Sequence, residues 1–76
     1  MSTIKEHERI VLTVDIPEEK LIAGDVGDVV HIHDAGKAYE VEFVALDGDT
    51  MAVVTLEHTQ IRPVEHHEIT HARRVA

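Results

Sequence analysis

The chain has 76 residues, of which 43% are hydrophobic, and no cysteine, so it forms one domain that folds without disulfides or zinc thiolates. Its 15 Asp and Glu residues against 7 Lys and Arg residues give a formal net charge of -8, which argues against nucleic acid as a partner, because binding to phosphates depends on Lys and Arg. No apolar run approaches the roughly 20 residues of a membrane span, and the first residues lack a signal peptide's apolar stretch. We expect a soluble, cytoplasmic protein.

The first half of the chain predicts two strands. Arg9–Val14 is short and rich in β-branched residues, which is typical of a strand, and Pro17 then begins a loop. Residues 25–28 have the composition of a turn. The second strand is expected over 29–33, and simple alternation places Val30 and Ile32 on its core face.

The second half predicts three more strands. Residues 34–37 form a hairpin loop, and residues 39–43 alternate between apolar and acidic side chains, the clearest strand signal in the chain. An Asp-Gly turn at 47–49 leads to a fourth strand over 51–56. A short fifth strand follows over 59–64, where Pro63 requires an edge position.

Five short strands at regular spacing, without a long helical period, predict an all-β fold, a small SH3-like barrel of four to five antiparallel strands. We expect residues 1–64 to form this single domain and residues 65–76 to form a His-rich C-terminal tail, for which a helix is one option. The predicted core consists of Val11, Leu12, Leu21, Val30, Ile32, Tyr39, Val41, Phe43, Val54, Leu56 and Ile61.

Several segments carry a family resemblance: residues 21–30, 38–43, 48–50, 53–56 and 61–63. Together they resemble a bacterial family catalogued as domain of unknown function 4926, over about residues 9–63. Gly24 and Gly27 before a valine-rich strand are also similar, locally, to the entry turn of SH3-like barrels such as the nitrile hydratase beta subunit. The family resemblance implies an accessory or antitoxin-like role beside a co-encoded protein, and it supplies no catalytic residue.

The acidic residues favour protein binding. The imbalance of charge lies in residues 15–64, which hold eleven acidic residues against Lys20, Lys37 and Arg62. Glu40 and Glu42 share one face of the third predicted strand, and Asp47 and Asp49 lie in the turn after it, so these four are the candidate partner-binding residues. Solvation of a small acidic barrel is the alternative role for the same four.

The histidines allow a metal-binding alternative. In a helical tail, His67 and His71 stand at positions i and i+4, within reach of one ion. Two ligands do not complete a site, and exposed tail histidines are commonly just solvated. His31 and His33 share a face of the second predicted strand, where they could form a pH-sensitive surface.

Three functional readings therefore stand. The first is a non-enzymatic acidic module that binds a protein partner. The second is a homo-oligomeric structural protein whose tail swaps onto a neighbour, and the third is a small enzyme or metal-binding protein that uses the histidines. No motif indicates an enzyme or a cofactor. Self-association is expected through an edge strand or through the tail, whose apolar residues are Val64, Ile69 and Val75.

Overall fold

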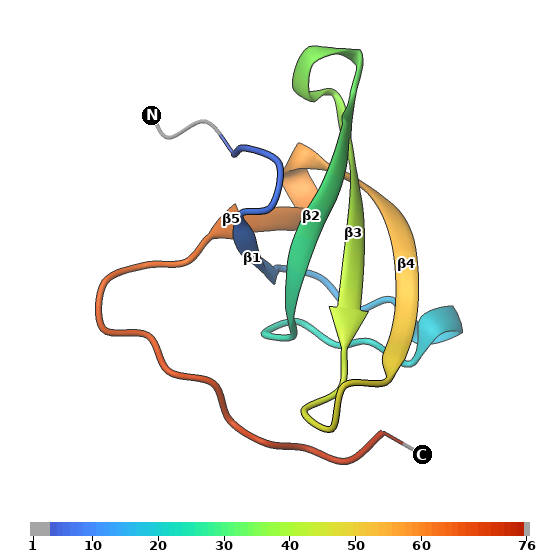
Figure 1. Ribbon diagram of the computed structural model, residues 1–76, viewed down its shortest axis with the longest axis vertical. Helices are drawn as coiled ribbons and strands as arrows, with labels where there is room; N and C mark the ends of the chain where they lie inside the picture. The colour runs from blue at the N-terminus through green and yellow to red at the C-terminus, as the bar shows by residue number, and fades with distance from the viewer. Residues whose placement is uncertain (1–3, 76) are drawn as a thin grey trace.

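The computed structural model describes residues 4–75 as a five-stranded antiparallel sheet that curls on itself (Figure 1). The strand order is β4-β3-β2-β1-β5. The bounds are Arg9–Leu12 for β1, Val26–His33 for β2, Ala38–Val44 for β3, Thr50–Glu57 for β4 and Ile61–Pro63 for β5. This order, in which the last strand returns beside the first, is that of an SH3-like barrel, so the predicted fold class is confirmed.

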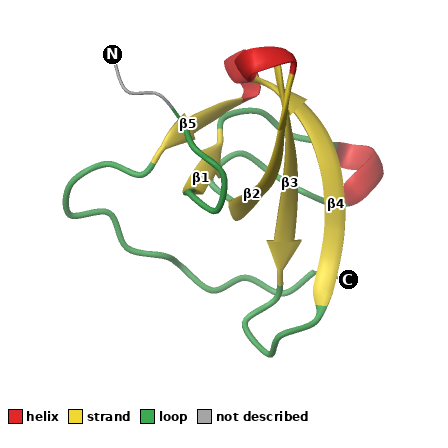
Figure 2. Ribbon diagram, turned by 45° about the horizontal axis from the view of Figure 1, so that its top comes forward, coloured by secondary structure: helices red, strands yellow, loops and turns green. Residues whose placement is uncertain are grey.

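Short 3-10 turns join several strands, and Figure 2 shows them as the sole helical elements of the described residues. They are η1 (Pro17–Glu19), η2 (Asp34–Gly36) and η3 (His58–Gln60). At η3, the Gln60 side chain accepts a hydrogen bond from the Glu57 backbone N–H at 2.8 Å. This bond fixes the sharp corner between β4 and β5, which lets Ile61 pair with Leu12 across the closing edge.

The core is mostly aliphatic, with Tyr39 and Phe43 as its aromatic members, and fills the inner face of the curled sheet. Eight of the eleven predicted core residues are buried, and Ile32 and Val54 pack partly buried against them. The sequence analysis missed five further buried residues, Ile4, Ile10, Ile16, Val29 and Ala52. Ile4 and Ile16 lie outside every strand, so strand periodicity gave no reason to choose them.

Val30 is the one predicted core residue that lies on the surface, and the prediction for it is wrong. Val29 pairs with Val41 and His31 pairs with Glu40, so Val30 is an extra residue in β2 at a β-bulge. The bulge reverses the alternation of β2. Val29 is fully buried, whereas Val30 is 39% exposed.

The tail is not helical. After Pro63 the chain has no strand or helix up to residue 75. The tail leads away from β5 and then runs back below the strands in the view of Figure 1. The predicted domain, 1–64, and the predicted tail, 65–76, include residues 1–3 and 76, which lie outside the described residues. Within residues 4–75, no helix is long and apolar enough to cross a membrane.

Two neighbouring valines test the bulge. We expect Val29→Ala to lower the free energy of unfolding by about 2 kcal/mol, because it removes buried methyl groups and leaves a cavity. Val30→Ala should change it by less than about 0.5 kcal/mol, as is usual at the surface. Urea denaturation of the two variants measures both values, and the reverse ranking would contradict the bulged register.

Candidate functional site

The outer face of the sheet carries a row of charged residues across three strands, which ends at an apolar residue on a fourth. Register aligns Arg9 of β1 with Asp28 of β2, Asp28 with Glu42 of β3, and Glu42 with Val53 of β4. Gly27, Val29, Val41 and Phe43 point inward between these positions. We call Asp28, Glu40 and Glu42 the acidic face.

Asp28 and Glu42 place two carboxylates directly opposite each other on neighbouring strands. Side chains in such pairs have Cβ atoms about 5 Å apart, and like charges there destabilise the sheet. Each carboxylate has a partner outside the pair. Arg9 Nε lies 3.4 Å from Asp28 Oδ1, and Thr50 Oγ1 donates a hydrogen bond to Glu42 Oε2 at 2.8 Å.

Glu40 lies in a small polar network beside this pair. His33 Nε2 is 3.1 Å from Glu40 Oε1, and Thr55 Oγ1 donates to the same oxygen at 2.8 Å. These two hydrogen bonds, that of His33 first, lower the pKa of the Glu40 carboxyl. Glu40 therefore stays ionised in mildly acidic solution.

The predicted pair His31 and His33 does share a face. Their rings meet edge to face with centroids 4.6 Å apart, and His31 Nδ1 lies 3.6 Å from Glu6 Oε2. Each imidazole thus has a carboxylate neighbour. Protonation of either ring would reduce the negative charge of this surface.

The four candidate partner-binding residues fall into two groups. Glu40 and Glu42 lie together on the outer face of β3, as expected. Asp47 and Asp49 occupy the β3–β4 turn, where Asp47 Oδ1 accepts the Asp49 N–H at 3.1 Å. Asp28 was missed by the sequence analysis because residues 25–28 read as a turn.

The tail histidines do not form the expected pair. His67 and His71 lie in irregular chain, so the helical i, i+4 spacing behind the metal prediction is absent. His67 instead stacks on His66, with ring centroids 3.7 Å apart. Residues 4–75 contain no cluster of three or more side chains suited to hold a metal ion.

The tail is held at its start by an ion-pair cluster. Arg62 donates from Nη1 to Glu68 Oε1 at 2.8 Å and from Nη2 to Glu68 Oε2 at 2.6 Å. The Glu65 N–H also donates to Glu68. The bond from Arg62, followed by that from Glu65, lowers the pKa of Glu68 from 4.5 to about 2.

This pKa predicts how the tail responds to acid. Because the folded pKa is the lower one, the Arg62–Glu68 pair is fully stabilising above pH 4.5 and loses its contribution as pH falls toward 2. In Arg62→Gln the Glu68 pKa should return toward 4.5. Carboxyl NMR titration measures it, and Arg9→Gln, with the same loss of charge elsewhere, should leave it unchanged. An unaltered Glu68 titration in Arg62→Gln would refute the pairing.

Comparison with known proteins identifies a family for which no activity is described. No curated protein and no solved structure matches the chain. One family model, described as a domain of unknown function, DUF4926, matches residues 6–63. These residues include β1 to β5 with the acidic face and the β3–β4 turn, and exclude the tail from residue 64 onward. The chain therefore belongs to the DUF4926 family.

Proposed function

We propose that this protein is a non-enzymatic binding module that recognises a more basic protein through its acidic face, with Asp47 and Asp49 at one end. The observation that carries the proposal is the pairing of Asp28 with Glu42. Two carboxylates held directly opposite each other oppose folding. A partner that supplies cations at this place would offset the like-charge repulsion that such a pairing produces.

The charge around this face supports the same proposal. Residues 15–64 hold eleven acidic residues and three Lys or Arg residues, so this segment carries the whole net charge of -8. Fields of one sign steer oppositely charged partners and raise association rates by ten- to a thousandfold. Exposed Val53 and Val30 lie on β4 and β2, beside the carboxylates, and give a partner apolar surface to bury.

The site composition also supports a binding role in preference to catalysis. Within residues 4–75, no buried side-chain polar atom lacks a partner, and the acidic face is not enclosed, since Glu40 and Glu42 lie on the outer face of β3 and Asp28, which lines an open groove, is 43% exposed. Paired carboxylates that act as acid and base flank an enclosed cleft. We place the module in the cytoplasm, as an accessory or antitoxin-like partner of a co-encoded protein.

Charge reversal at two positions tests the binding proposal. Tagged full-length chain captures a basic partner from the native host at low salt, and the partner is identified by mass spectrometry and purified. The association rate constant of the double variant Glu40→Lys, Glu42→Lys should then fall by about tenfold or more at low salt. The difference should shrink as salt shortens the Debye length below about 10 Å.

The matched control for this experiment is Glu18→Lys, Glu19→Lys. Both residues are exposed in η1, and the double change also moves the net charge from -8 to -4. Its association rate should fall by less than about threefold, because only the long-range field changes. Equal rates for the two double variants would show that net charge, and not the acidic face, governs binding.

Stability gives a second, independent test of the strained pair. Glu42→Lys places a cation opposite Asp28, so the free energy of unfolding should rise by about 0.2–1 kcal/mol while binding weakens. Thermal and urea denaturation measure the change. A loss of stability in Glu42→Lys would show that repulsion from Asp28 costs less than the hydrogen bond from Thr50 contributes.

A further inference from the structure

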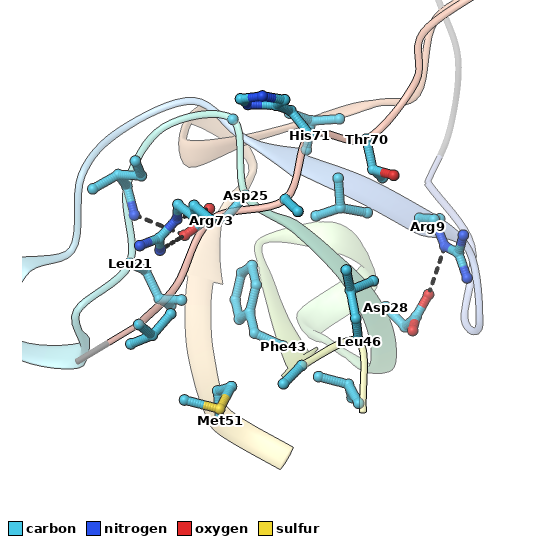
Figure 3. Close-up of a pocket in the computed structure, with 18 of the residues that line it drawn as sticks. Arg9, Leu21, Asp25, Asp28, Phe43, Leu46, Met51, Thr70, His71 and Arg73 are labelled. Carbon is cyan, nitrogen blue, oxygen red and sulfur yellow. Dashed lines mark hydrogen bonds and ion pairs between the residues drawn. The ribbon is translucent and has the colours of Figure 1, made fainter. Parts of the chain in front are cut away.

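An open groove lies between the tail and the barrel (Figure 3). Val11 and Val26, which pair across β1 and β2, line it together with Leu46 and Met51 near the β3–β4 turn. Leu46 is 87% exposed and Met51 is 43% exposed. The groove thus carries apolar side chains among charged ones such as Asp28 and Asp49, and the exposure of Leu46 and Met51 shows that the tail does not cover its rim at the turn.

The far end of the tail is anchored by one arginine. Arg73 donates from Nε to Asp25 Oδ1 at 2.8 Å and from Nη2 to Asp25 Oδ2 at 2.5 Å, and its Nη2 also lies 3.1 Å from the Lys20 carbonyl oxygen. The Asp25 side chain is only 16% exposed. Burial raises its pKa, but the bonds from Arg73 and the Ile22 N–H outweigh burial and leave the pKa lowered. This geometry makes a specific receptor for a guanidinium group.

Between its two anchors the tail makes no polar contact with the barrel among the described residues. Among the described residues, no hydrogen bond or ion pair connects residues 69–72 to another part of the chain. Ile69 is 92% exposed, the highest value among the large hydrophobic residues that the structure describes. Ile69 of the tail is therefore exposed to water, and so are Leu46 and Met51 at the rim of the groove.

We propose that two copies of the chain exchange their tails, so that Arg73 of each binds Asp25 of the other. The chain carries both Arg73 and its acceptor Asp25, so a dimer with two-fold symmetry would contain two Arg73–Asp25 ion pairs. Exchange keeps every anchor contact that the single chain makes. It also brings a second chain over the groove, where Ile69 can pack against Leu46 and Met51 of the other copy, which buries apolar surface that a small core lacks.

Reversing the charges of Asp25 and Arg73 in separate variants distinguishes tail exchange between two chains from docking of the tail on its own chain. Asp25→Arg and Arg73→Asp each place like charges at the anchor, so each variant alone should dimerise at least about tenfold more weakly than wild type, in analytical ultracentrifugation at micromolar to millimolar concentration. An equimolar mixture restores opposite charges only between different chains. The mixture should therefore recover the dimer, as a heterodimer.

Arg74→Asp is the matched control, because it makes the same charge change one residue beyond the anchor and should therefore weaken dimerisation far less than Arg73→Asp does. A wild type that stays monomeric across this range, or a mixture that stays monomeric when wild type dimerises, would overturn the proposal. If a single variant fails to fold by circular dichroism, the double variant Asp25→Cys, Arg73→Cys replaces it. Because the chain has no other cysteine, oxidation should give a species of two-chain mass, and a product of one-chain mass alone would equally refute exchange.

Discussion

The close approach of β2 and β3 at Gly27 is the contact on which the rest of the barrel depends. A Cβ atom at Gly27 would lie 2.7 Å from Val41 Cγ1 and 2.9 Å from Phe43 Cε2, distances that real side chains do not tolerate. Ile10 of β1 is paired with Gly27 and is fully buried. The missing side chain therefore lets Val41 and Phe43 close over the sheet, which gives a chain with one Tyr and one Phe a dense core.

The outer face follows from this inner packing. Because Gly27 and Val29 must point inward, Asp28 must point outward, and the register then sets it opposite Glu42. The bulge at Val30 restores an outward direction to His31 and His33, which places both imidazoles near carboxylates. The acidic face is thus a consequence of strand geometry, since the register of β2 and β3 sets the positions of its carboxylates.

Local pattern was enough to predict the strands but not their detailed register. Residues 39–43 alternate without ambiguity, so β3 and its inward and outward residues were predicted correctly. Val29 and Val30 are identical in type, and only tertiary pairing with Val41 decides which one is buried. The anchor of the tail could not be predicted for a different reason. Arg73 and Asp25 are 48 residues apart in the sequence, and no local sequence pattern indicates that two such distant residues form an ion pair.

Charge connects the tail to the acidic face. Residues 15–64 have a net charge of -8, and the tail returns a cation, Arg73, to Asp25 in this segment. Asp28 lines the groove beside the tail and also belongs to the acidic face, so the tail arginines lie near the negative surface that a basic partner would meet. Such a surface attracts a cation more strongly when its other carboxylates are not already paired with cations. Every carboxylate within a Debye length contributes to this attraction. Arg74, one residue beyond the anchor, adds a second positive charge near the same surface when the tail is docked. Release of the tail would therefore strengthen the field that a basic partner meets, and docking of the tail would weaken it.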